Sequence, residues 1–283
     1  LSNKLPAFET ERDYWIETSR PTNALPIARP TGANTVGDSR EMVVGFDEQT
    51  TASLKALKQP VNVVLLLALA QTLKQWSQND TVVLDMEGHG RHVWDESLNL
   101  ARTVGWFTSL YPLRLSLPSG SLDEQLEQVA GQLERVPNGG SGYGALRFSE
   151  SESADIIAPA EISFNYLGQL AVETTGFITG LASEPVPATK DLRGDRKYLF
   201  EIVALIQSDQ LQIRWRYSEQ QYQQSTLEQL TQRFSSNVRS LIAHCEQPEA
   251  NKMATADFSA ARVDAGQLSQ LIGKLQDRGG QAS

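Results

Sequence analysis

The segment from Val61 to Trp76 places the strongest constraint on the fold, because it is apolar on more than one side. Its leading apolar residues recur at the helical spacings of four, four and three: Leu65, Leu69, Leu73 and Trp76. Leu66 and Leu67 widen the apolar surface beyond a single face. The longest apolar run, Val63 to Ala70, is far shorter than the roughly 18 residues that a membrane span requires. The sequence therefore predicts a mostly buried helix that other elements must cover.

Strand and helix patterns alternate irregularly along the rest of the chain. Runs of β-branched and alternating apolar residues predict strands at 81–86, 162–166, 200–206 and 211–217. Apolar stripes predict helices at 122–133 and 227–245, and each follows a capping-box pair, Ser121 with Glu124 and Ser225 with Glu228. The last two strands predict an antiparallel hairpin. The expected fold class is α+β, a two-layer α/β sandwich with a largely antiparallel or mixed sheet.

Three segments predict little regular structure. Residues 1–40 carry several prolines and predict an extended segment with at most a short helix around 13–15. The glycine-rich stretch 138–144 predicts a loop. After Pro248 the chain turns to Ala, Gln, Gly and Ser, so we expect residues 1–247 to form one unit and 248–283 a linker or tail.

Composition narrows the class of partner. A formal net charge of -9 with no run of basic residues argues against nucleic acid, which needs clustered cations. The single cysteine, Cys245, excludes internal disulfides and continues the apolar stripe of the last helix, which favours a small buried side chain over a nucleophile. The N-terminus lacks Met and any signal-peptide pattern. We expect a cytoplasmic fragment of a longer protein, with no membrane partner.

Glu87 is the carboxylate whose position best suits chemistry. It ends an apolar strand at a glycine turn, where a carboxylate can project into a cleft and serve as a general base or acid. A solvated turn glutamate has the same local pattern, and the local sequence alone favours that interpretation. His89 and His92 lie three residues apart, but the glycine and arginine between them do not fit a helical pair of metal ligands. No metal site is expected.

Four stretches in order resemble the motifs of one family. They are Glu87–Arg91, then Arg102–Thr108 continuing to Tyr111–Pro112, then Pro137 with Gly140–Gly144, then Phe164–Gln169. In this order and at this spacing they are similar to the epimerization domains of nonribosomal peptide synthetases. The resemblance covers nearly the whole chain and identifies it as the C-terminal lobe of such a domain. It implies a two-lobed member of the condensation superfamily, each lobe resembling chloramphenicol acetyltransferase, with the active site in a tunnel between the lobes.

The same resemblance implies the reaction and its residues. The family inverts the α-carbon of an aminoacyl or peptidyl thioester by removing a proton and returning one to the opposite face. By resemblance Glu87 is one proton-handling group. Asn165 and Tyr166 match positions that line the tunnel, and a strand end whose side chains cap backbone groups explains them equally well. Four residues are implied as support for the tunnel or its loops: His89, Arg91, Trp106 and Tyr143. For Trp106 we favour packing beside the core, and for Arg91 hydrogen bonds that orient the glutamate loop.

The resemblance also implies partners and leaves alternatives. No cofactor binds directly, because the substrate arrives on the phosphopantetheine arm of a peptidyl carrier protein. The other implied partners are the N-terminal lobe of the same domain, which carries the second proton-handling group, a histidine, and neighbouring synthetase domains. The chain departs from the family at His92, at Asn99 and in a shortened segment 57–63. A lobe that only binds or positions a carrier protein is the main alternative. A peptide-bond-forming condensation lobe is another, which the motifs at 87–91 and 105–108 disfavour.

Overall fold

The residues that the structure describes form one mixed sheet of six strands in the order β1-β6-β5-β4-β2-β3. This computed structural model describes residues 8–91, 99–100, 102–117, 120–148, 160–170 and 190–247. The strands are β1 (Ser39–Gly45), β2 (Thr81–Gly88), β3 (Ser109–Ser116), β4 (Ile162–Leu170), β5 (Phe200–Gln207) and β6 (Gln210–Ser218). β4 pairs in parallel with both β2 and β5, and the other pairs are antiparallel. The mixed sheet and the β5–β6 hairpin confirm the predicted class.

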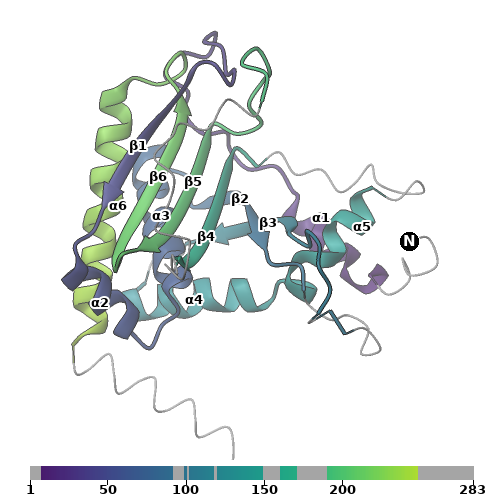
Figure 1. Ribbon diagram of the computed structural model, residues 1–283, viewed down its shortest axis with the longest axis horizontal. Coiled ribbons are helices and arrows are strands. Elements are labelled where there is room, and N and C mark those ends of the chain that lie inside the picture. Colours follow the sequence, from purple (N-terminus) through teal and green to yellow (C-terminus); the bar gives the residue numbers. More distant parts are fainter. Residues whose placement is uncertain are drawn as a thin grey trace, which may run out of the picture.

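The helices form the second layer (Figure 1). They are α1 (Arg12–Thr18), α2 (Glu48–Ala56), α3 (Val61–Ser77), α4 (Leu122–Glu134), α5 (Ser141–Arg147) and α6 (Gln224–Cys245), with short 3-10 turns at Glu9–Glu11 and Pro137–Gly140. α3 lies against β2 and contacts α4 and α6 on its other sides. α1 and α5 lie beside β3, at the end of the sheet. The two-layer sandwich expected from the sequence is therefore present.

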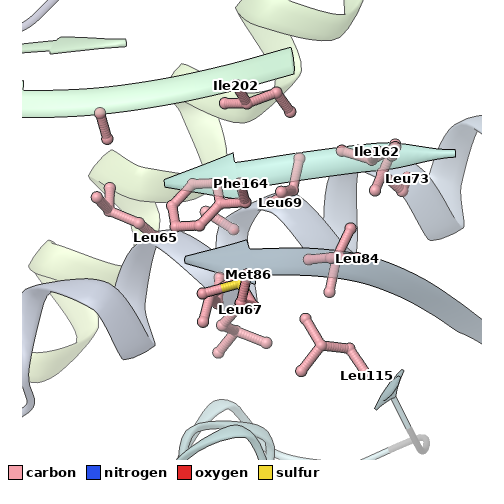
Figure 2. Packing of buried hydrophobic residues seen from close by; sticks show 14 of the residues in the cluster. Leu65, Leu67, Leu69, Leu73, Leu84, Met86, Leu115, Ile162, Phe164 and Ile202 are labelled. Carbon is pink, nitrogen blue, oxygen red and sulfur yellow. The ribbon is translucent and has the colours of Figure 1, made fainter. Parts of the chain in front are cut away.

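Helix α3 is the centre of the core, as its sequence predicts. Every residue from Val63 to Ala70 is buried. Figure 2 shows its leucines beneath the inward side chains of β2 and β4, among them Leu84 and Phe164. Truncating a fully buried leucine such as Leu67 to alanine typically costs about 2–5 kcal/mol. No single helix among the described residues reaches the length and apolar content of a membrane span, and α2 with α3 reaches it only across a bend of 110°.

Several local predictions are confirmed and others are wrong. The capping box at Ser121 and Glu124 is present in both directions. The second box is wrong, because α6 begins at Gln224 and Ser225 already lies inside its first turn. The predicted loop at 138–144 is also wrong: Asn138, Gly139 and Gly140 take positive φ angles, and α5 begins directly after them. The short helix predicted near residue 13 is α1.

Besides α5, three elements have no counterpart in the sequence expectations: β1, α2 and β3. β3 carries Pro112 at its centre, which argues against a strand when read locally. β3 tolerates this proline because it lies at the edge of the sheet, where one side of the strand has no hydrogen-bonded neighbour. The predicted tail at 248–283 and His92 lie outside the described residues.

The two faces of the sheet differ in what covers them. Strand residues alternate between faces, so each strand contributes apolar side chains to the side that packs on the helices. On the opposite side β2 presents Val83, Asp85 and Glu87, and β6 presents Arg214 and Arg216. No described helix covers this face, which we call the open face.

A substitution at Gly140 tests whether the turn before α5 depends on its close contact with β3. Its φ is +80°, and a Cβ there would lie 1.9 Å from the Tyr111 ring. Gly140→Ala is expected to lower the free energy of unfolding by about 2–4 kcal/mol, from left-handed strain plus overpacking. Gly144→Ala is the matched control, because its Cβ meets nothing within 4 Å inside α5. Urea unfolding should show the control unchanged or more stable by up to about 1 kcal/mol. Equal losses in both variants would contradict the importance of the contact between Gly140 and Tyr111.

Candidate functional site

Glu87 and Asn165 meet on the open face of the sheet. The Asn165 side-chain nitrogen Nδ2 donates a hydrogen bond to Glu87 Oε2 at 2.6 Å. The strands set this contact: β2 and β4 are parallel with Met86 opposite Phe164, so the next residues along face each other. Two motifs separated by 78 residues in sequence thus form one polar pair.

Tyr166 lies on the other face of β4. Successive strand residues point to opposite sides, so Tyr166 follows Phe164 toward the helices and not Asn165 toward the open face. Its side chain is half-buried against the core, and this desolvation raises the pKa of the phenol. The structure therefore separates the two residues that the sequence motif places side by side, and Asn165 is the one that lies beside Glu87.

A groove of about 780 Å³ runs along the open face at this pair. Its floor includes Glu87, Asn165 and Ser163 from β2 and β4, with Leu110 from β3. The segment 190–198 forms one wall. Glu87 reaches the groove from the next-to-last residue of β2, and Asn165 reaches it from the middle of β4.

The loop that follows Glu87 is held by a second motif. Gly90 has a φ of +63°, and a Cβ there would lie 1.4 Å from the carbonyl oxygen of Phe107. The Arg91 guanidinium donates to the carbonyls of Leu100 and Thr103 and lies 4.4 Å from the centre of the Phe107 ring. The Arg91 contacts thus connect the stretch 87–91 to the stretch 102–108.

The other predicted support residues have different surroundings. His89 is exposed, and its Nδ1 accepts a hydrogen bond from the Arg91 amide at 3.0 Å. Packing of Trp106 beside the core is wrong, because its side chain is 90% exposed and Phe107 takes the inner position. Tyr143 is buried in α5 against Trp15, and its hydroxyl accepts from Arg147 at 2.9 Å. Burial raises the pKa of Tyr143. It supports α1 and α5 and not the groove.

Sequence reasoning missed a cluster beside Glu87. The buried Asp85 accepts hydrogen bonds at the same oxygen, Oδ2, from Lys197 Nζ at 2.6 Å and from the Tyr198 hydroxyl at 2.7 Å. Burial, the hydrogen bond to Asp85 and the charge of Glu87 all raise the pKa of Tyr198. A charged residue inside the apolar run 82–86 was the available signal, because a buried carboxylate requires a partner. Its partner, Lys197, lies 112 residues away in the sequence, so no local pattern identifies it.

The described residues hold no cluster of three or more His, Cys, Asp or Glu side chains arranged to bind a metal ion. Within that part of the chain, His89 therefore belongs to no such cluster.

Comparison with solved structures defines the class of fold. The chain matches the epimerization domain from the third module of tyrocidine synthetase B at 32% identity with a TM-score of 0.72, over 83% of this chain and 55% of that one. The condensation domain of Monacolin K polyketide synthase shares the fold at 15% identity and a TM-score of 0.59, over 86% of this chain and 60% of that one. The chain thus spans about half the length of the solved epimerization domain.

The relatives in sequence are large synthetases. A linear gramicidin synthase of Brevibacillus parabrevis is 36% identical over 285 residues, which is 95% of this chain and 4% of that protein. Gramicidin S synthase 1 of Brevibacillus brevis is 31% identical over 290 residues, 95% of this chain and 26% of that protein. The Condensation domain family model matches residues 3–263. The chain belongs to the condensation-domain family of nonribosomal peptide synthetases.

Gly90 tests whether the two loops depend on each other. Gly90→Ala is expected to detach the loop at 107–109 from the loop after Glu87, because no side chain fits against the Phe107 carbonyl. Amide hydrogen exchange at residues 107–109 should rise by at least about tenfold, equivalent to roughly 1.4 kcal/mol of lost local stability. Gly105→Ala is the control in the same loop, where the added methyl meets only the Phe107 ring at 3.2 Å. Unchanged exchange in Gly90→Ala would show that the loops are independent.

Proposed function

We propose that this chain is the C-terminal lobe of an epimerization domain, in which Glu87 moves the proton at the α-carbon of a carrier-bound aminoacyl or peptidyl thioester. The observation that carries the proposal is the hydrogen bond between Glu87 and Asn165 on the floor of the groove. It joins two of the four ordered motifs in one place. The 32% identity to a solved epimerization domain supports the same activity.

The geometry suits removal of a weakly acidic proton. Asn165 holds Oε2 of Glu87, which leaves Oε1 to take the proton from the α-carbon. The electron pair of the broken C–H bond moves into the thioester carbonyl and forms an enolate. The Asn165 amide has two N–H donors, so the one that Glu87 does not use can donate to the enolate oxygen. A proton returned to the opposite face completes the inversion.

The proposed reaction needs a second proton-handling group and a carrier. The resemblance assigns that group to a histidine of the N-terminal lobe, and no His-His-x-x-x-Asp-Gly motif occurs in this sequence. The chain covers 55% of the solved epimerization domain, which fits one lobe of two. We propose the N-terminal lobe, a peptidyl carrier protein with its phosphopantetheine arm and neighbouring synthetase domains as partners. The proposed location is the cytoplasm.

A peptide-bond-forming condensation lobe is the second candidate, because the matching family model carries the name Condensation domain. The two activities differ at the α-carbon. Epimerization exchanges the α-proton of the thioester with solvent, whereas condensation joins an amine to the thioester carbonyl and leaves the α-carbon intact. Exchange of deuterium into a carrier-bound aminoacyl thioester, with the N-terminal lobe restored, separates them. Peptide formation without exchange would favour condensation.

Glu87→Gln is expected to lower α-proton exchange by about 100-fold to 10,000-fold in the restored domain, because the amide cannot accept the proton. The measurement is deuterium incorporation by mass spectrometry together with the ratio of stereoisomers. Glu127→Gln is the matched control, since Glu127 is exposed on α4 in the helical layer. If Glu87→Gln exchanges as fast as the control, Glu87 is not the base, and a scaffolding lobe becomes the better explanation.

Two variants of Asn165 separate orientation from charge. Asn165→Ala removes the donor to Glu87 and should lower exchange by roughly tenfold to 100-fold at all pH values. Asn165→Asp places a second carboxylate where the donor stood, 2.6 Å from Glu87 Oε2, so the pair shares a proton. Its exchange should therefore require a higher pH than the wild type. A pH profile of exchange measures both effects; identical profiles for the two variants would contradict the role of this hydrogen bond.

A further inference from the structure

Asp85 and Glu87 are two carboxylates on one strand and on one face. They lie two residues apart in β2, and both point to the open face. Strand geometry places residues i and i+2 roughly 6.5 Å apart. Two negative charges at this spacing repel each other. The charge of Asp85 therefore acts on Glu87 unless a nearby cation offsets it.

Lys197 supplies the cancelling charge. Its Nζ lies 2.6 Å from Asp85 Oδ2 and donates to the Tyr198 hydroxyl at 2.9 Å. The Asp85 side chain is 3% exposed, whereas that of Lys197 is 49% exposed. The ammonium thus sits at the mouth of the cluster, between the buried carboxylate and the groove that Glu87 also lines.

We propose that Lys197 is a positioning residue for Glu87: by pairing with Asp85 it offsets the negative charge that lies beside the carboxylate acting in the groove. The inference rests on the proposed function for the role of Glu87. The proximity of the three charges is itself a property of the described residues, since Asp85 and Glu87 share one face of β2 and Lys197 is bonded to Asp85.

The other charged side chains of the groove do not replace Lys197. They are Lys190, Asp195, Arg196, Glu201 and Arg216. Arg196 and Arg216 both pair with Glu201 on β5, and Arg216 also pairs with Glu41 on β1. Lys190 and Asp195 carry opposite charges on the wall of the groove. Among the described residues, the cation bonded to the neighbour of Glu87 on β2 is Lys197. The imidazole of His89 follows Glu87 in the adjacent loop and is present unchanged in every variant below.

The test is a pH titration of the Glu87 carboxyl in the 283-residue chain. Carboxyl ¹³C resonances of labelled glutamate are followed by NMR, and the Glu87 signal is assigned by its loss in Glu87→Gln. Lys197→Met leaves Asp85 uncompensated and should move the midpoint of the Glu87 titration up. Asp85→Asn leaves Lys197 uncompensated and should move it down. Each shift is expected to be about 0.5 to 1.5 pH units for charges at this separation.

Matched variants isolate the cause. The double variant Asp85→Asn with Lys197→Met removes both charges and should return the midpoint to near the wild-type value. Lys197→Arg keeps the cation and should do the same. Lys55→Met removes one cation from a surface pair with Asp209 and should have no effect. If Lys197→Met fails to fold, the midpoints of Asp85→Asn and Lys197→Arg still test the role of Lys197: the first should move down and the second should stay near the wild-type value.

The outcomes separate the inference from the proposed function. Midpoints that stay at the wild-type value in Lys197→Met and Asp85→Asn, or that move in the same direction, overturn the role of Lys197 whatever the catalytic assay gives. Opposite shifts support it. In the restored domain, the pH needed for α-proton exchange should then move with the Glu87 midpoint, up in Lys197→Met and down in Asp85→Asn. Exchange that is insensitive to Glu87→Gln overturns the proposed function while the titration still reports the coupling.

Discussion

The burial of α3 is the constraint on which the rest of the structure depends. A helix that is apolar from Val63 to Ala70 on every side must be covered on every side. The sheet covers one side, and α4 and α6 cover others, so the helices gather on one face of the sheet. The opposite face is left for other uses. The polar pair and the groove occupy it, which is why the candidate site is floored by strands and has no described helix above it.

The alternation of side chains along each strand and the register between strands place the polar residues of the candidate site together. Alternation sends Leu84 and Met86 into the core and Asp85 and Glu87 onto the open face of the same strand. Parallel pairing of β2 with β4 then brings Asn165 to Glu87. A slip of one residue between these strands would put Phe164 or Tyr166 on the open face in its place. The apolar side of β4 therefore fixes the position of the catalytic candidate.

Local patterns predicted the elements that have a long apolar run, a regular alternation of apolar residues or a capping pair. The apolar helix at 61–76, the hairpin at 200–217 and the capping box at Ser121 all follow from short-range rules. β3 was missed because Pro112 marks a break when read alone, and only the order of the strands shows that it lies at an edge. Glycines at 139 and 140 predicted a loop, whereas in the fold they make the left-handed turn that allows α5 to begin at once.

The site was predictable only in part, for a related reason. Motif order selected Glu87 and Asn165, and pairing of parallel strands brought them together. The same motif suggested Tyr166, but a motif is read along the chain and a strand uses alternate residues. Almost nothing in the sequence indicates that Asp85 pairs with Lys197, because the two residues are 112 positions apart. Pairing across that distance depends on where the 190–198 segment returns to the sheet, which no local pattern encodes.

The buried position of Asp85 raises the question of why a charged residue occupies this point of β2. A carboxylate that is 3% exposed gives up its hydration, and a pair with a half-exposed lysine recovers little more than it loses. An apolar residue at this point of β2 would continue the run from Val82 to Met86 and pack beside Val83 and Tyr198. Stability therefore does not explain the ion pair. Its position, two residues from Glu87 on the same face of β2, fits the role proposed for Lys197, because the ammonium offsets the negative charge that Asp85 would otherwise place beside Glu87.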